Sequence, residues 1–250
     1  GYVRSTRGGG NRLSSCIKAF TLAEGTTCVG TLEDNRFSAF TLAEVLVTLG
    51  IIGVVSAMTV PSLMQNYQRQ SYVTQLHKVY NELSQALVRY QNDKNAINLK
   101  EAGLTSQAEL NSFFKTYFKV VNDCGETQTP CLASSYKTIS GRTIGTSFNL
   151  PSYMTLASGA SFGAYYSGGT ILFYLYLDTN GQKGPNIAGR DVFAIYIYNN
   201  GLIDDNCGVN GAPCTKEERD TVFNANCIAG KTTWYGCFGK ILNDNWEMTY

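Results

Sequence analysis

The stretch FTLAEVLVTLGIIGVVSAMTVP, residues 40–61, is the segment around which the rest of this chain is organised. It is almost entirely apolar, carries one charge at Glu44 and ends at Pro61. Because a helix rises about 1.5 Å per residue, this segment would be roughly 30 Å long, enough to cross the hydrocarbon core of a bilayer. The sequence therefore predicts a membrane-spanning helix at residues 40–61.

Glu44 requires an explanation, because an acid at the centre of a span costs on the order of 2.5–3.5 kcal/mol, and less near an end. Ala39 lies directly before the apolar run, and processing peptidases accept small residues at their cleavage sites. Cleavage between Ala39 and Phe40 would create a free amine close to the Glu44 carboxylate. In an assembly, Glu44 of one subunit would then pair with the amine of the next. The alternative is an ordinary signal anchor with an incidental acid near its edge.

The segment resembles the N-terminal signature of type IV pilins and type II secretion pseudopilins. In that family a small residue precedes the cut, the mature chain starts Phe-Thr-Leu, and Glu and Pro follow at its fifth and twenty-second positions. The matching residues here are Ala39, Phe40, Thr41, Leu42, Glu44 and Pro61, although the family more often has Gly before the cut. The resemblance implies that a prepilin peptidase cleaves before Phe40 and methylates its amine, and that the apolar helix becomes a filament core.

The chain is thereby divided into a leader at 1–39, a transmembrane and filament-core helix at 40–61 and a soluble domain at 62–250. Basic residues outnumber acidic ones in the leader, and a basic flank keeps that side of a span in the cytoplasm. We expect a single-pass protein of the bacterial inner membrane with its soluble domain outside the cytoplasm, and a filament after assembly. AFTLAE occurs at 19–24 and again at 39–44, but only the second copy precedes an apolar run.

The helical pattern continues after Pro61. Apolar residues recur mostly three and four positions apart, at Leu63, Tyr67, Tyr72, Leu76, Val79, Leu83, Ala86 and Tyr90. We therefore predict one long helix at 40–92, bent at Pro61 because proline removes a backbone donor. Its first half lies in the membrane and its second half packs on the soluble domain. A shorter helix is expected within 107–121, with Ser106 as its N-cap.

The second half of the chain favours β-strands. Residues 170–177 and 192–198 are strongly strand-like, and weaker candidates lie at 143–149 and 161–166. Alternation within these strands predicts two faces of the sheet. The face toward the helix carries Ile171, Phe173, Leu175, Leu177, Phe193, Ile195 and Ile197. The opposite face carries Tyr174, Tyr176, Tyr196 and Tyr198. The result is an α+β fold, a long N-terminal helix packed on an antiparallel sheet, as the pilin resemblance also implies.

Cysteine usage indicates an oxidising compartment. Of eight cysteines, Cys16 and Cys28 precede the predicted cut, and the mature part keeps Cys124, Cys131, Cys207, Cys214, Cys227 and Cys237. An even number behind an export segment is typical of disulfides. Spacing favours local pairs, which are Cys124 with Cys131, Cys207 with Cys214, and Cys227 with Cys237. The main rival joins the last four across the two loops, for example Cys207 with Cys227.

A candidate calcium site lies between the two strong strands, in DTNGQKGPNIAGRD at 178–191. The side chains of Asp178, Asn180, Asn186 and Asp191 offer oxygen ligands, which Ca²⁺ prefers. Some pseudopilins carry calcium in a comparable loop, so the resemblance supports this interpretation. The alternative is a turn in which Asp178 and Asn180 bond their own backbone, and the nearby Lys183 counts against a cation. No other cofactor is expected.

Function follows from these features. The chain has one histidine and lacks the usual nucleophile, zinc and phosphate-binding motifs, so we do not expect an enzyme. With 20 basic and 19 acidic residues, its charge does not favour nucleic acid. We expect a structural subunit of a type IV pilus or a type II secretion pseudopilus. Its partners would be the membrane, other pilins, the prepilin peptidase and, indirectly, the assembly platform and its ATPase. The alternative is a membrane-anchored minor pilin that binds a ligand or DNA through its tyrosine-rich face or disulfide loops.

Overall fold

The computed structural model describes residues 41–145, 148–208, 210–229 and 233–250. The chain divides into two compact units, Gly1–Gly50 and Ile51–Tyr250, and of the first only the start of helix α1 is described. Ala39, Phe40, Cys16, Cys28 and the first AFTLAE copy lie outside the described residues. The predicted cleavage and methylation positions therefore stay predictions.

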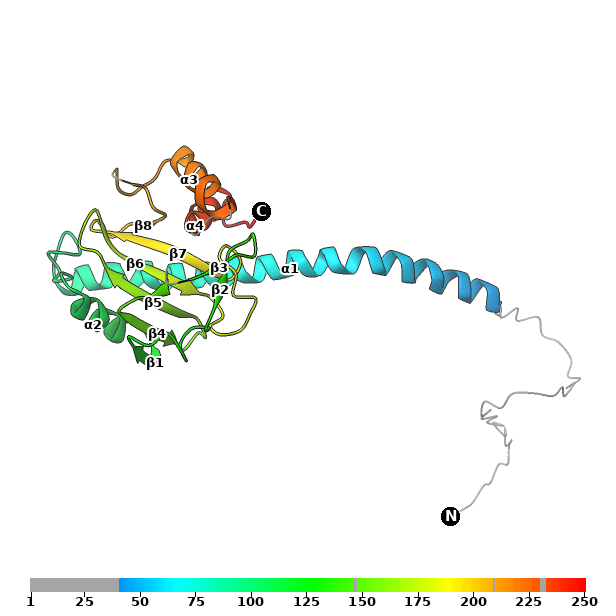
Figure 1. Ribbon diagram of the computed structural model, residues 1–250, viewed down its shortest axis with the longest axis horizontal. Helices are drawn as coiled ribbons and strands as arrows, with labels where there is room; N and C mark the ends of the chain where they lie inside the picture. Colours follow the sequence, from blue (N-terminus) through cyan, green and yellow to red (C-terminus); the bar gives the residue numbers. More distant parts are fainter. Residues whose placement is uncertain (1–40, 146–147, 209, 230–232) are drawn as a thin grey trace, which may run out of the picture. The chain divides into compact units, whose positions relative to one another are not determined.

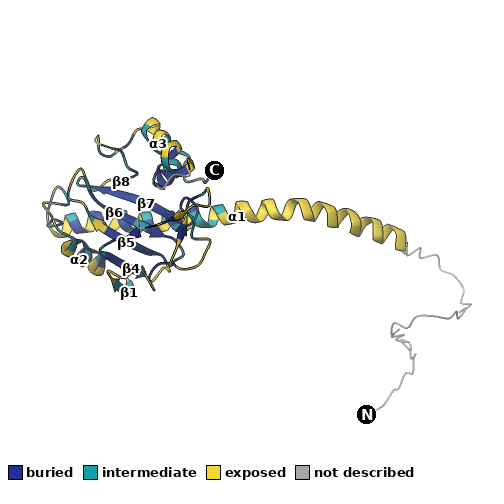
Figure 2. Ribbon diagram, in the orientation of Figure 1, coloured by how far each residue is buried: buried dark blue, intermediate teal, exposed yellow. Residues whose placement is uncertain are grey.

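Helix α1, Leu42–Asp93, is 52 residues long and passes through Pro61 without ending. The long helix predicted from the apolar run and the stripe behind it is confirmed. Every residue from 41 to 68 is exposed, whereas the later turns bury one face (Figure 2). The buried residues of that face are Val73, Leu76, Val79, Leu83, Ala86, Leu87 and Tyr90. Within the described part of the chain, the second half of α1 is thus the half that packs on the core.

The sheet against which α1 packs has six antiparallel strands in the order β1-β4-β5-β6-β7-β8 (Figure 1). These strands are β1 (Val120–Gly125), β4 (Ser152–Leu156), β5 (Ser161–Tyr166), β6 (Ile171–Asp178), β7 (Val192–Tyr198) and β8 (Ile203–Asp204). A separate pair joins β2 (Tyr136–Lys137) to β3 (Thr143–Ile144). The α+β arrangement predicted from the sequence is confirmed, and β7 is buried on both faces as a central strand.

The main core lies between α1 and one face of the sheet. It contains Phe173, Leu175 and Leu177 of β6 and Phe193, Ile195 and Ile197 of β7, as alternation predicted. Ile171 is the exception, because the pairing of β6 with β7 shifts between Ile171 and Phe173. This irregularity turns Leu172 toward α1 and leaves Ile171 on the other face.

A second core covers the tyrosine-rich face of the sheet. Tyr196 and Tyr198 are buried there with Tyr136, Phe148 and Trp234. The rings of Tyr136 and Phe148 stack with centroids 4.3 Å apart, and those of Phe148 and Trp234 with centroids 5.1 Å apart. Much of this face is therefore internal, so Tyr196 and Tyr198 are not accessible to a ligand as the binding-module hypothesis would require.

The remaining helices are short. Helix α2 (Gln107–Tyr117) begins at the predicted N-cap, since the Ser106 side chain accepts a hydrogen bond from the Glu109 backbone N–H. The segments around the last two disulfides, named above only as loops, include α3 (Lys216–Val222), a π-helix (Phe223–Ile228) and α4 (Cys237–Asn243). Gly236 allows this packing, because its φ is 93° and a Cβ there would lie 2.7 Å from the Val222 carbonyl oxygen.

Candidate functional site

The start of α1 places Glu44 in a specific local arrangement. Its carboxylate Oε2 accepts hydrogen bonds from the Thr41 backbone N–H at 2.8 Å and from the Thr41 hydroxyl at 2.9 Å. The Thr41 Oγ1 in turn accepts a hydrogen bond from the Glu44 backbone N–H at 3.2 Å. This reciprocal pattern is a capping box, in which Thr41 is the N-cap and Glu44 the third helical residue. Glu44 thus has a local role that the sequence analysis did not identify.

The first half of α1 also has the length and composition of a membrane span. Its most apolar 18-residue window has a mean hydropathy of 2.0, and none of that window is buried. The exposed side chains include Leu46, Leu49, Ile52 and Val55, each at least half accessible. Because water does not favour such a surface, this half of the helix needs an apolar environment, either lipid or neighbouring subunits.

Among the described residues, three disulfides form, Cys124–Cys131, Cys207–Cys214 and Cys227–Cys237. They are the local pairs that the spacing favours, and none follows the rival connectivity. The separations of 7, 7 and 10 residues close small loops. Such loops stabilise chiefly by restricting the unfolded chain, by roughly 2–3 kcal/mol each in the chain-entropy model.

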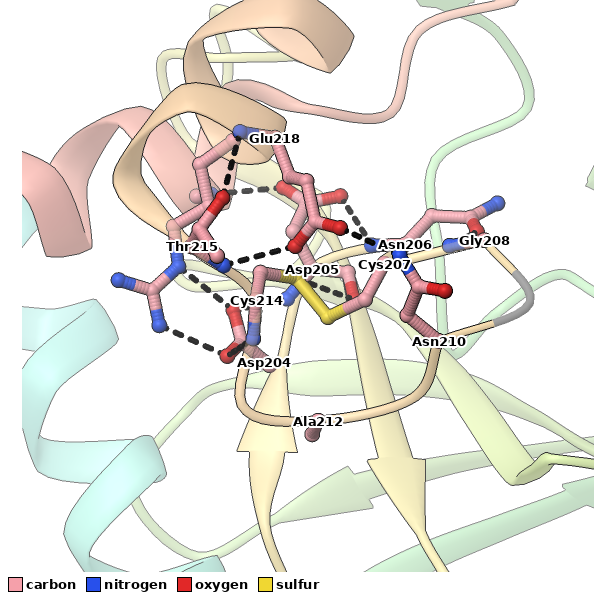
Figure 3. Close-up of a disulfide and its surroundings, with 12 residues drawn as sticks. Asp204, Asp205, Asn206, Cys207, Gly208, Asn210, Ala212, Cys214, Thr215 and Glu218 are labelled. Carbon is pink, nitrogen blue, oxygen red and sulfur yellow. Dashed lines mark hydrogen bonds and ion pairs between the residues drawn. A yellow bond between two sulfur atoms is a disulfide. The ribbon is translucent and has the colours of Figure 1, made fainter.

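The second disulfide lies beside two buried aspartates (Figure 3). Asp204 accepts hydrogen bonds from the Cys214 backbone N–H at 2.9 Å and, bidentately, from the Arg219 guanidinium at 2.7 and 2.8 Å. Asp205 accepts from the backbone N–H groups of Gly236 at 3.1 Å and Gly239 at 2.6 Å. These carboxylates tie the 207–214 loop to α3 and α4.

The same loop is held to α3 by a second capping box. Thr215 and Glu218 exchange side-chain-to-backbone hydrogen bonds at 2.8 and 3.1 Å, and Asn210 donates to the Glu218 carboxylate at 2.7 Å (Figure 3). Hydrogen bonding to the Thr215 backbone lowers the pKa of Glu218. This cluster therefore supports structure at the loop's base.

Asp204, Cys207 and Cys214 also have potential ligand atoms within 4.8 Å of one another. Both sulfur atoms are, however, joined in a disulfide, and Asp204 is paired with Arg219. A thiolate is the sulfur species that binds metal, so this group does not form a metal centre while the disulfide is intact.

The candidate calcium loop runs between β6 and β7, and its two acids are fully buried. Asp178 accepts hydrogen bonds from the Tyr136 hydroxyl at 2.8 Å and the Asn180 backbone N–H at 3.2 Å. Asp191 accepts from the backbone N–H groups of Asn186 and Ile187, both at 2.8 Å. The loop thus brings the predicted residues together, although neutral donors bind their carboxylates.

Both buried acids of this loop have raised pKa values. Burial and the charge of Asp191 raise the pKa of Asp178 to about 7, although the Tyr136 hydroxyl bond lowers it. Burial also raises the pKa of Asp191, against the lowering effect of the Ile187 and Asn186 N–H groups. Neither carboxylate has an ion-pair partner among residues 41–145, 148–208, 210–229 and 233–250. Two adjacent buried acids without a positive partner favour a bound cation or a proton.

The side-chain amide oxygens of the loop are also suited to a bound cation. Asn180 Oδ1 and Asn186 Oδ1 are buried and accept no hydrogen bond. An acceptor that is buried without a donor costs roughly 1–3 kcal/mol, and a hard cation would satisfy it. The donor set of two carboxylates and two amide oxygens therefore fits calcium chemistry. Lys183, which counted against a cation, is exposed.

The roles of two residues in these sites were not predicted from the sequence. Tyr136 lies 42 positions before Asp178, so nothing local connected its hydroxyl to the loop. Thr41, by contrast, was recognisable, because Thr followed three residues later by Glu before an apolar run is the usual sign of a capping box. Thr41 was named as part of the family signature, but its capping role was not inferred.

Comparison with family models identifies the prokaryotic N-terminal methylation motif at residues 34–60. This is the type IV pilin and pseudopilin signature, and it coincides with the segment that begins α1. Comparisons with curated proteins and with solved structures gave no match. The motif indicates a structural, pilin-like subunit rather than an enzyme, and a single-pass membrane anchor.

Proposed function

We propose that this chain, which carries the pilin and pseudopilin signature, is a subunit of a type IV pilus or a type II secretion pseudopilus. The observation that carries the proposal is the first half of α1, an apolar helix exposed on all sides that bears one acid near its start. In the inner membrane, lipid covers this helix and the soluble domain at 62–250 lies outside the cytoplasm. In the filament, the corresponding helices of neighbouring subunits replace the lipid.

Processing is the first step of this proposal. A prepilin peptidase cuts between Ala39 and Phe40, removes residues 1–39 and methylates the new amine. Intact-mass analysis of the membrane-extracted protein is expected to give a chain that begins at N-methylated Phe40. An uncut chain, or a mature chain that begins at another residue, contradicts this step.

Assembly depends on Glu44 in the proposal, but its capping role must be separated from its charge. Glu44→Gln keeps a side-chain acceptor for the capping box and removes the charge. Because losing one partner of a buried charge pair costs roughly 2–5 kcal/mol, the assembled fraction should fall at least about tenfold. Insertion into the membrane should not suffer, since the span becomes less polar. Sheared filaments and carbonate-extracted membranes, quantified by immunoblotting, measure both fractions.

The matched variant is Thr41→Val, which disrupts the capping box and keeps the charge. We expect it to assemble like the wild type, after mass analysis has shown normal cleavage. Thr48→Val is a second control, because Thr48 lies in the same apolar segment and its hydroxyl donates to the Val45 carbonyl of its own helix. If Thr41→Val fails to assemble and Glu44→Gln assembles normally, Glu44 acts as a helix cap and the charge-pair model is wrong.

A calcium site at Asp178, Asn180, Asn186 and Asp191 is the second part of the proposal, supported by the two orphan amide oxygens and the unpaired buried acids. Calcium titration of the full chain in detergent micelles tests it by calorimetry. We expect one site in the wild type and its loss in Asp191→Asn. Asp123→Asn is the matched control, because Asp123 is an exposed acid that pairs with Lys115. Equal heats for all three proteins would contradict the site.

A further inference from the structure

A groove of about 290 Å³ lies between α1 and the β6–β7 loop, close to the end of the apolar half of the helix. Its walls include Gln65, Gln68 and Arg69 from α1 and Ile187 and Arg190 from the loop. No acidic side chain is among the residues that line it. The groove therefore presents two guanidinium groups and two side-chain amides, which are hydrogen-bond donors suited to an anion.

The two arginines of this groove have no acidic side chain as a partner. Arg69 is half-buried, and its guanidinium takes part in no hydrogen bond or ion pair among the residues that the structure describes. Arg190, on the facing wall, donates to the sulfur of Met248 at 3.8 Å and to the backbone oxygen of Tyr250 at 3.3 Å. The planar guanidinium matches the geometry of phosphate oxygens, so this pair of side chains is suited to a phosphate group.

The groove begins where the apolar half of α1 ends. Met64 is the last residue of the apolar half, and Gln65 begins a polar stretch. Because a helix rises about 1.5 Å per residue, Arg69 lies about 6 Å beyond Gln65, within a headgroup layer that is about 5–7 Å thick. Tyr67 is 73% exposed in the same turn, and tyrosine is enriched at membrane–water interfaces. In a membrane that surrounds the apolar half of α1, the groove is therefore at the level of the lipid headgroups.

We propose that this groove binds the phosphate of an anionic lipid headgroup, so that the β6–β7 loop lies against the membrane surface before assembly. The inference rests on the membrane insertion of the proposed function and does not depend on calcium. A lipid is favoured over a free anion, because its acyl chains would lie along the exposed apolar turns that precede Gln65. The competing partner of Arg69 is Glu247, an exposed acid in a neighbouring groove that Arg69 also lines.

Hydrogen exchange of the full chain in lipid nanodiscs, in chelator, tests the inference. Compared with phosphatidylcholine alone, nanodiscs that contain phosphatidylglycerol should slow backbone exchange at residues 183–190. One arginine at an anionic surface contributes about fivefold in affinity, so Arg69→Gln should reduce this protection about fivefold. Arg89→Gln is the matched control and should leave the protection unchanged, because Arg89 is exposed on the same helix about 30 Å further from the apolar half.

A further arm identifies the source of the anion. Inorganic phosphate added to phosphatidylcholine nanodiscs should not slow exchange at residues 183–190, and equal slowing would mean that a free anion fills the groove and that the lipid assignment is wrong. If the chain does not enter nanodiscs, the proposed membrane anchor fails and the inference with it. If the chain enters and Arg69→Gln responds to phosphatidylglycerol like the wild type, only the role of the groove is overturned, as expected if Glu247 holds Arg69.

Discussion

Two ion pairs of this fold are expected to contribute very unequally to its stability, because one is buried and the other lies on the surface. Asp204 is 2% exposed and is held by two hydrogen bonds from the Arg219 guanidinium, whereas Lys115 and Asp123 pair on the surface with 53% and 38% of their side chains exposed. Removing a partner from a buried pair leaves an uncompensated charge in a poorly polarisable environment. Removing one from a surface pair returns the other to water.

Arg219→Met is therefore expected to lower the free energy of unfolding by roughly 3–5 kcal/mol. The charge of Asp204 then lies buried without a cation, although the Cys214 and Asp205 N–H groups still bond to it. Lys115→Met serves as the surface control and should cost less than about 1 kcal/mol. Thermal unfolding of the full chain in detergent measures both, and similar small losses would mean that the buried pair contributes no more than a surface one.

At the scale of elements, the β6–β7 loop contacts several parts of the chain that follows α1. Gly189 lies against the third disulfide, since a Cβ there would meet Cys237 Sγ at 2.8 Å and Cys227 Sγ at 3.3 Å. Arg190 donates to the sulfur of Met248, and Asp178 accepts from Tyr136 across the second core. This loop therefore contacts both the C-terminal tail and the second core.

The protonation of Asp178 gives this loop a defined pH dependence. Its folded pKa of about 7 is above the unfolded value of about 3.9, so the folded chain binds the proton more tightly. In chelator, this group therefore makes the chain lose stability as pH rises from about 4 to about 7. Calcium competes with the proton, so its stabilising effect should be large at pH 8 and small at pH 5.

Thermal midpoints measured between pH 5 and pH 8, with calcium and with chelator, check this expectation. With Asp178→Asn, the thermal midpoints measured with calcium and with chelator should change with pH in nearly the same way, because Asn does not titrate. A calcium-induced shift of equal size at pH 5 and pH 8 would exclude competition between calcium and this proton.

At the scale of the whole molecule, the proposed topology places the residues before the apolar half of α1 and the disulfides after it in opposite compartments. The apolar half of α1 has the length of a span, and the three disulfides follow it in the sequence. Disulfides persist outside the reducing cytoplasm. The leader, with its basic excess, would stay on the cytoplasmic side until it is removed.

Thiol alkylation in living cells tests this topology. A cleavage-deficient Ala39→Leu precursor should react at Cys16 and Cys28 and remain unreactive at Cys124 and the later cysteines. The internal control is the same protein after reduction, in which every cysteine should react. Complete labelling of the later cysteines in unreduced cells would place the domain in the cytoplasm and contradict the proposed localisation.

Several features of this protein were determined by local sequence. The apolar run at 40–61, the helical stripe behind it and the alternation in 192–198 each reflect a periodicity that a short segment carries by itself. They were sufficient for α1, for β7 with its helix-facing residues, and for the α+β class. Short loops between cysteines likewise favoured the local disulfides, because closing a small loop restricts the chain least.

The tertiary structure alone decided what depends on contacts between distant segments. Four features were not evident from the sequence. They are the irregular pairing at Ile171, the edge strand β1, the burial of Tyr196 and Tyr198, and the helices after Cys214. The chemistry of the loop is of the same kind. Its four oxygen-bearing residues were visible in the sequence, but the burial that raises the pKa of Asp178 arises only when distant segments pack around it. Desolvation is a property of the packed molecule, and no short segment carries it.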